Sequence, residues 1–317
     1  MHILLAAPRG FCAGVNMAIN TLHEAVEKYG TPLYVFHEIV HNNHVVEEFR
    51  SRGVTFVNSL DEVPEGVCLM YSAHGVSPEI RRKSAERSLK IIDATCPLVN
   101  RVHLQARKLA AEGFSVILIG HAGHDEIVGI VGEAPDVIQT LCSAEEVETL
   151  SVPDAEKVAY LTQTTLSVDE TLEIISKLQE RFPKLRTPIP SCICYATQNR
   201  QRGVRELAPR CDLVLVVGSV SSSNSRRLKE LALRQGTPAL LLDGVEELHV
   251  GMFRDVENVL ITAGASAPEW VVQSIVQKLQ EDYRATLETV EICQETLRFR
   301  VPIENEEDMR FFIHNGE

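Results

Sequence analysis

Short runs of aliphatic residues alternate along the chain with stretches in which apolar residues recur every three to four positions. Seven of these runs end in a loop of small or polar residues, and a helical pattern usually follows the loop. The runs are Ile3–Ala7, Cys68–Tyr71, Ile91–Thr95, Val116–Ile119, Val158–Leu161, Leu213–Val217 and Val259–Thr262. Continuous apolar strands that alternate with helices are typical of parallel sheets covered on both faces. The pattern therefore predicts an α/β protein.

The helical pattern is clearest over residues 15–29, where apolar side chains keep the helical period and Gly30 marks the end. Similar periods cover residues 97–113 and 271–279. In open α/β sheets, ligands bind where strands end and helices begin. We therefore expect the chemistry of this protein in the loops that follow the seven strands.

The number and spacing of these units predict three similar α/β modules around a common centre. We place the first module at residues 14–96 and the second at 97–193. The third combines residues 1–13 with 194–281. The pattern is lost from about residue 282, so 282–317 is interpreted as a C-terminal tail that docks through its aromatic residues.

Three of the eight cysteines, Cys12, Cys96 and Cys194, each stand where a loop turns into a helix. Free N–H groups and the positive end of a helix stabilise a thiolate, so we expect lowered thiol pKa values here. We interpret the three as ligands of one iron–sulfur cluster, in which a three-ligand set leaves one iron open to substrate. Cys192 is an alternative third ligand, and an ordinary buried core position is the alternative for each cysteine.

Zinc is the competing metal. His124 and Glu126 match half of the zinc-deaminase pattern, in which His-x-Glu is followed by Cys-x-x-Cys. The pair in this chain is Cys192-x-Cys194, which is one residue too short. The chain contains no Cys-x-x-Cys pair at all, which also disfavours structural zinc.

Polar side chains in the strand-end loops are suited to binding an anion. They are imidazoles, hydroxyls and one amide, and no Gly-Lys-Ser/Thr phosphate loop is present. The candidates for binding a substrate are His41, His74, His124, Thr164, Ser222, Ser223, Asn224 and Ser266. Helix capping for the hydroxyls and ordinary satisfied positions for the histidines are the alternatives. Glu126 is the candidate proton donor, because burial beside an anion raises the pKa of a carboxyl group.

Composition narrows the classes of partner and the compartment. The chain has 44 acidic and 31 basic residues and a net charge of −13, so it has no general attraction for nucleic acid. It shows no basic leader and no run of about 18 apolar residues, so we expect no membrane span and a cytoplasmic location. Cysteines in such a protein favour metal or redox chemistry over disulfides.

Eight motifs, taken together, resemble those of the 4-hydroxy-3-methylbut-2-enyl diphosphate reductases, the last enzymes of the non-mevalonate isoprenoid pathway. The resemblance runs in order from residue 1 to about 281. The motifs are Pro-Arg-Gly-Phe-Cys-Ala-Gly-Val at 8–15, His-Glu-Ile-Val-His-Asn at 37–42, Ser-Ala-His-Gly-Val at 72–76, Asp-Ala-Thr-Cys-Pro-Leu-Val at 93–99, Gly-His-Ala-Gly-His at 120–124, Thr-Gln-Thr-Thr-Leu-Ser at 162–167, Ile-Cys-Tyr-Ala-Thr at 193–197 and Thr-Ala-Gly-Ala-Ser-Ala-Pro at 262–268.

The resemblance implies a trefoil of three α/β modules around one [4Fe–4S] cluster per chain, held by Cys12, Cys96 and Cys194. It implies that the histidine, serine and asparagine candidates surround the substrate diphosphate, with Glu126 and Thr164 near the substrate hydroxyl. The reaction would be reductive dehydroxylation to isopentenyl and dimethylallyl diphosphates. Ferredoxin or flavodoxin would donate the electrons, since no Gly-x-Gly-x-x-Gly dinucleotide motif is present.

Two other classes of protein share some of these features. Another three-cysteine cluster enzyme, such as a hydro-lyase or a quinolinate synthase, would need a different arrangement of anion-binding groups. A non-catalytic redox sensor would need a reachable cluster and no ordered substrate cup. Affinity for a small allylic diphosphate would separate a sensor from an enzyme.

Overall fold

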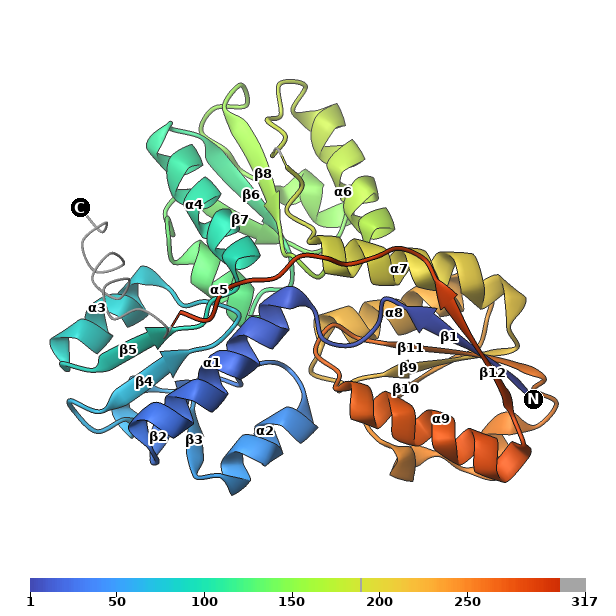
Figure 1. Cartoon of the computed structure of the whole chain (residues 1–317). Coiled ribbons are helices and arrows are strands. Elements are labelled where there is room, and N and C mark those ends of the chain that lie inside the picture. Colours follow the sequence, from blue (N-terminus) through green and yellow to red (C-terminus); the bar gives the residue numbers. More distant parts are fainter. Residues whose placement is uncertain (189, 303–317) are drawn as a thin grey trace.

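The computed structural model describes residues 1–188 and 190–302. Its strands form three parallel sheets of five, four and three strands, and the three modules built on them surround a common centre (Figure 1). The predicted α/β trefoil with mainly parallel sheets is therefore confirmed. All seven predicted strands are present, and the limits of the three modules in sequence stay a prediction.

The first sheet in sequence has the strand order β3-β2-β4-β5. Its buried side chains pack mainly against α1, whose apolar stripe ends at Gly30 in the left-handed region (φ 73°). The elements are α1 (Ala13–Tyr29), β2 (Leu33–Phe36), α2 (Asn43–Ser51), β3 (Val54–Val57), β4 (Cys68–Tyr71), α3 (Pro78–Glu86) and β5 (Lys90–Asp93).

The second sheet has the order β7-β6-β8, and β6, whose residues 116–119 are buried, lies at its centre, as a continuous apolar run predicts. The elements are α4 (Pro97–Ala111), β6 (Ser115–Ile119), α5 (Asp125–Val131), β7 (Ile138–Leu141), β8 (Val158–Thr162) and α6 (Val168–Arg181).

The third sheet joins both ends of the chain in the order β10-β9-β11-β1-β12. The N-terminal strand β1 pairs in parallel with β11 on one side and with β12 on the other. The elements are β1 (His2–Ala7), α7 (Tyr195–Leu207), β9 (Leu213–Val217), α8 (Ser223–Arg234), β10 (Ala239–Leu242), β11 (Asn258–Ala263), α9 (Glu269–Tyr283) and β12 (Thr286–Glu291).

The stretch interpreted as a tail is only partly a tail. Residues 286–291 form β12, an edge strand whose side chains are mostly exposed, so it lacks the apolar pattern used to find the other strands. The aromatic residues expected to dock the tail, Phe311 and Phe312, lie outside the described residues.

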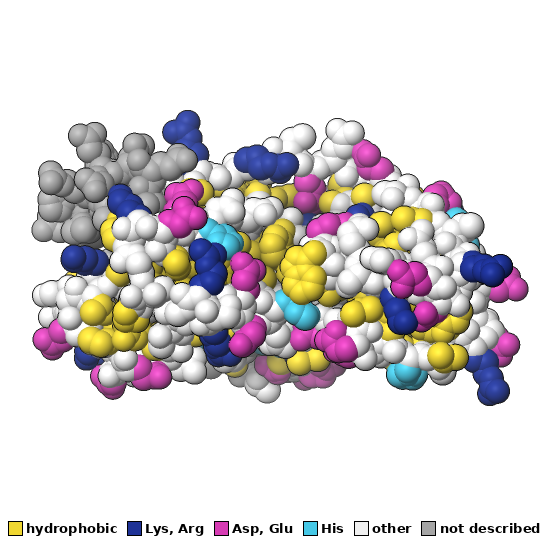
Figure 2. Space-filling model, turned by 60° about the horizontal axis from the view of Figure 1, so that its bottom comes forward, with side chains coloured by type: hydrophobic (Ala, Val, Ile, Leu, Met, Phe, Trp, Pro, Cys, Tyr) yellow, Lys and Arg dark blue, Asp and Glu magenta, His cyan; other side chains and the backbone are white. Residues whose placement is uncertain are grey.

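The surface view in Figure 2 shows acidic and basic side chains interspersed over one face, with hydrophobic side chains between them. The negative net charge is therefore not gathered into one field on this face. Within the described ranges, every helix is too short or too polar to cross a lipid bilayer.

Candidate active site

Cys12, Cys96 and Cys194 each occupy the residue immediately before a helix. Cys12 precedes α1, Cys96 precedes α4 and Cys194 precedes α7, so the three helices belong to three different modules. All three cysteines line one central cavity. The structure therefore brings together the three cysteines that the sequence singled out.

Gly14 shows how closely two of these cysteines approach the first turn of α1. A Cβ atom placed on Gly14 would lie 2.5 Å from Cys96 Sγ and 4.0 Å from Cys12 Sγ. Real Cβ atoms do not come as near to sulfur as the first of these distances. Glycine is required here for space.

Replacement of Gly14 by alanine is therefore expected to push Cys96 Sγ away from the other two thiols. The variant should fold, because alanine favours a helix more than glycine does. It should retain much less iron than the wild type after anaerobic reconstitution with iron and sulfide. Full iron retention in Gly14→Ala would contradict the close approach.

The expected lowering of the thiol pKa is wrong for the free thiols of Cys96 and Cys194. Burial, followed by the neighbouring Cys12, raises the pKa of Cys96 to about 12 and that of Cys194 to about 11. Backbone N–H groups at the helix starts do act in the opposite direction, but the loss of hydration outweighs them. These two thiols are therefore neutral near pH 7, and binding iron displaces their protons.

Cys192 and Cys194 lie in different surroundings. Cys192 is completely buried, packs among apolar side chains of the second module, and its Sγ lies 3.5 Å from Gln105 Oε1. It does not line the cavity that Cys194 lines. Cys194 is therefore the better placed of the two candidate third ligands.

The spacing of the three thiols indicates whether they suit a single metal ion or a cluster. Among the residues that the structure describes, His41, His74 and Asp125 are the one set of three potential ligands whose donor atoms all lie within 4.8 Å of one another. The three cysteines are not such a set, whereas sulfurs on one tetrahedral zinc ion stand about 3.8 Å apart. A cluster in which each cysteine binds its own iron suits the wider spacing.

Three histidines form one wall of the same cavity. The rings of His41 and His74 stack with their centroids 4.1 Å apart, and His124 meets both rings edge-on at 5.2 and 5.8 Å. Burial, followed by the neighbouring His41, lowers the pKa of His74 well below its usual range and that of His124 to about 3. Without a bound anion, these two imidazoles are therefore neutral hydrogen-bonding groups.

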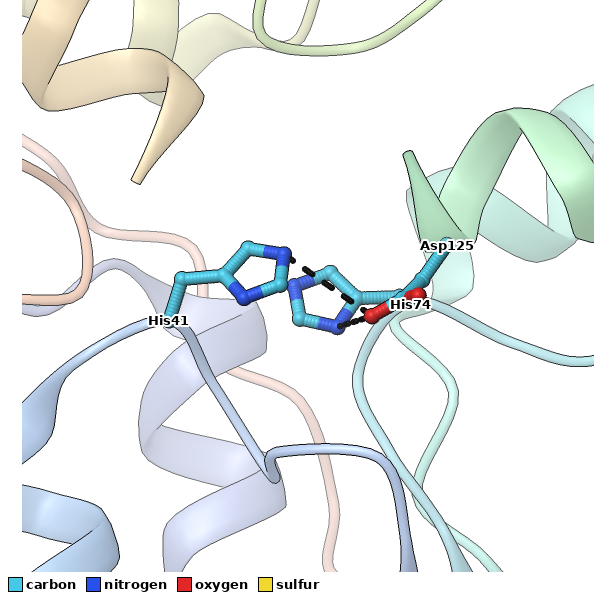
Figure 3. A group of neighbouring side chains, drawn as sticks. All are labelled: His41, His74 and Asp125. Atoms are coloured by element: carbon cyan, nitrogen blue, oxygen red, sulfur yellow. Dashed lines mark ion pairs between the residues drawn. The ribbon is translucent and has the colours of Figure 1, made fainter. Parts of the chain in front are cut away.

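Asp125 is a neighbour of the histidines that the sequence analysis did not single out. Its Oδ2 lies 4.0 Å from His41 Nε2 and 4.0 Å from His74 Nδ1, and Figure 3 shows the carboxylate beside both rings. Its position between His124 and Glu126 in the sequence was the available signal. Asp125 therefore brings a carboxylate beside these imidazoles, where burial still holds the pKa of His74 well below its usual range.

The serine and asparagine candidates line the same cavity as the histidines, and three of them, Ser222, Ser223 and Asn224, stand at the start of α8. Ser222 caps this helix by accepting a hydrogen bond from the Ser225 N–H, so the capping alternative holds for Ser222. Ser266 donates to the backbone oxygen of His41 at 3.0 Å. In contrast, Ser223 Oγ and both side-chain polar atoms of Asn224 are buried without a hydrogen-bond partner.

Such unpartnered buried polar atoms are costly and call for a ligand or ordered water. Ser223 and Asn224 both line the central cavity and stand in the first turn of a helix, where the N–H groups favour an anion. This part of the cavity can therefore receive a group with several acceptor oxygens.

Glu126 and Thr164 form a buried pair on another side of the cavity. Glu126 is 1% exposed; its Oε1 accepts from the Thr164 N–H at 2.7 Å, and its Oε2 accepts from the Thr164 hydroxyl at 2.8 Å. Burial raises the pKa of Glu126 to about 7, although both hydrogen bonds from Thr164 lower it. Thr164 does not cap the following helix, because Ser167 does so. The pair can hold and transfer a proton near neutral pH.

Together these features are typical of an α/β enzyme. The candidate active site is the central cavity, which is lined by the three cysteines, by buried Glu126 and by the histidine, serine and asparagine candidates. Residues 3–280 match the family model described as LytB protein. The chain belongs to this family.

Relatives with known names agree with this assignment. The chain is 53% identical over 302 residues to a 4-hydroxy-3-methylbut-2-enyl diphosphate reductase of Rhodopirellula baltica, covering 95% of each chain. It is 50% identical to that of Mycolicibacterium paratuberculosis, covering 96% of this chain and 92% of the relative. The solved structure of the E-1-hydroxy-2-methyl-but-2-enyl-4-diphosphate reductase of Plasmodium falciparum superposes with a TM-score of 0.94 at 37% identity, covering 100% and 99% of the two chains. The resemblance found in the sequence is confirmed.

Proposed function

We propose that the protein reduces (E)-4-hydroxy-3-methylbut-2-enyl diphosphate to isopentenyl and dimethylallyl diphosphates. One substrate, two electrons and two protons give one product and one water. The allylic C–O bond breaks, and a C–H bond forms at either of two carbons. The observation that carries the proposal is that buried Glu126, unpartnered Asn224 and the three cysteines face the same cavity.

Cys12, Cys96 and Cys194 would hold one [4Fe–4S] cluster per chain. The fit rests on their convergence at three helix starts, on the space left by Gly14, and on a spacing wider than that of one zinc ion. When bound, such a cluster supplies electrons singly and offers one iron without a protein ligand.

The diphosphate would lie between the histidines and the start of α8. His41, His74 and His124 donate ring N–H groups from one side, and Ser222, Ser223 and Asn224 supply hydroxyl and amide donors from the other. Ser266 lines the same side, and its hydroxyl would turn from the His41 oxygen to the diphosphate. Binding there would satisfy the buried atoms of Ser223 and Asn224 that lack partners. It would also orient the substrate, leaving its hydroxyl end toward Glu126 and Thr164.

Glu126 would deliver the proton with which the substrate hydroxyl leaves as water. With a pKa of about 7, a large share of this carboxyl is protonated at neutral pH, and the reaction does not need a free hydroxide to leave. Thr164 holds both carboxyl oxygens, so it fixes the direction of the acid and can relay the proton through its own hydroxyl.

The electrons would come from an external one-electron donor, and we propose that this donor is ferredoxin or flavodoxin. A cytoplasmic location stays a prediction from the sequence.

Turnover of the allylic diphosphate by the anaerobically reconstituted protein, with reduced methyl viologen as electron donor, tests the proposal. We expect both five-carbon diphosphates as products, and no product from the corresponding alcohol without phosphate, because the anion cup would stay empty. A protein that assembles a cluster but neither binds nor converts the diphosphate would contradict the proposal and support a redox sensor.

A further inference from the structure

The C-terminal chain continues beyond β12 as an extended segment, residues 292–302, which we call the C-terminal strap. Figure 1 shows it in red, running along α7 from the third sheet toward the other two modules. The Ile292 N–H donates to the Ala7 oxygen at 2.7 Å, and the Ile292 side chain lies 3.5 Å from where a Cβ on Gly203 of α7 would stand. The strap is therefore fixed to α7 where it begins.

Arg200 of α7 is the strap's principal partner. Its side chain is completely buried, and its Nη1 donates to Glu295 of the strap at 3.0 Å. Asn199 also donates to Glu295, at 2.9 Å. A buried guanidinium requires a counter-charge, and Glu295 is the carboxylate that provides it.

Two further hydrogen bonds of Arg200 reach the backbone on either side of the cysteine site. Nη2 donates to the Gly10 oxygen at 2.6 Å, and Nη1 donates to the Ala196 oxygen at 2.9 Å. Gly10 stands two residues before Cys12, and Ala196 stands two residues after Cys194. One planar group therefore joins the two segments that carry these cysteines.

Cys96 is not joined to this network. Its helix, α4, belongs to another module, and its backbone N–H bonds to the Ala73 oxygen of the first module. Disturbing the Arg200 network should therefore move Cys12 and Cys194 and leave Cys96 in place.

We propose that Arg200 and Glu295 are positioning residues that hold Cys12 and Cys194 at the separation the cofactor needs, so that the C-terminal strap is part of the cofactor site. The cofactor side of this inference rests on the proposed function. Neither residue lines the cavity, so their effect on the site passes through the backbone of the two cysteine segments.

Glu295→Gln tests the inference with little change in shape, and Arg200→Lys keeps the charge while losing the planar fork. Arg202→Gln is the matched control, because Arg202 lies on the same helix in an exposed pair with Glu206, and such pairs contribute little. We expect the two test variants to lose cluster iron to a chelator at least about tenfold faster than the wild type, since breaking a buried pair is strongly destabilising. The control should match the wild type.

Thiol labelling of the metal-free proteins separates positioning from general loss of stability. In Glu295→Gln, Cys12 and Cys194 should react faster with a thiol reagent while Cys96 keeps its wild-type rate. Equal acceleration at all three cysteines, or no change in cluster loss, would overturn the inference. If the wild type assembles no cluster, the proposed function fails, and the labelling pattern alone still decides whether the pair positions the two cysteines.

Discussion

Glu126→Gln is expected to lower turnover by about two to four orders of magnitude, the usual contribution of a positioned acid. Glutamine has nearly the same shape and can still accept from the Thr164 N–H while donating to the Thr164 hydroxyl oxygen. The cluster spectrum and iron content should therefore stay those of the wild type. Full activity in this variant would show that another group supplies the proton.

The pH dependence of the same pair of proteins gives a second measurement. The donor must be protonated, so wild-type turnover should fall as the pH rises through about 7, the pKa of Glu126. The residual turnover of Glu126→Gln should lack this step. An unchanged profile would assign the step to another group.

The Glu126→Gln substitution should raise stability above neutral pH, although it lowers activity. The folded pKa of Glu126 is raised above its ordinary value of 4.5, so between about pH 4.5 and 7 the folded state holds a proton that the unfolded state has released. The free energy of unfolding of the wild type therefore falls with rising pH over this window. At pH 8 the metal-free Glu126→Gln protein should be more stable by on the order of 3 kcal/mol, with the difference vanishing near pH 4.

Substitution of a cysteine that faces the cavity is the second change with a very large expected effect on iron content and turnover. Cys194→Ser should lose most of its iron and all measurable turnover, because it removes one of three thiols that face the cavity. Cys192→Ser should keep both, at a cost in stability of about 1–2 kcal/mol for a hydroxyl in an apolar core. Anaerobic iron and sulfide analysis of both variants, with Cys12→Ser and Cys96→Ser alongside, measures the difference. Cluster loss in Cys192→Ser with retention in Cys194→Ser would reverse the assignment.

The strands that the sequence predicted are those with two local signals, an apolar run and a polar loop where the run ends. Strands β2, β3, β7 and β10 were not predicted, although each has four residues. In β3 and β7 the polar residues Thr55, Gln139 and Thr140 interrupt the apolar run. Strand β12 has no buried face and is defined by its pairing with β1, which no local pattern reveals.

The features of the candidate site also differ in whether a local sequence signal predicts them. The helix starts at Cys12, Cys96 and Cys194 were predictable, because glycine, proline and helical period are local signals. The approach of Asp125 to His41 and His74 depends on how two modules pack, and the pair of Arg200 with Glu295 joins positions 95 residues apart. The thiol pKa direction was mistaken because it is set by depth of burial, which also depends on packing.

The interior place of β1 in the third sheet, between β11 and β12, has a consequence for synthesis of the chain. The first two sheets use strands that lie close together in sequence, so each can form as soon as its own segment leaves the ribosome. Strand β1 must wait for β11, roughly 250 residues later, which takes about 10 to 50 seconds at about 5–20 residues per second. During that time the nascent chain carries an unpaired apolar strand at its leading end. Chaperone binding to this strand is therefore expected to matter more for this protein than for one whose sheets each form from a single stretch of sequence.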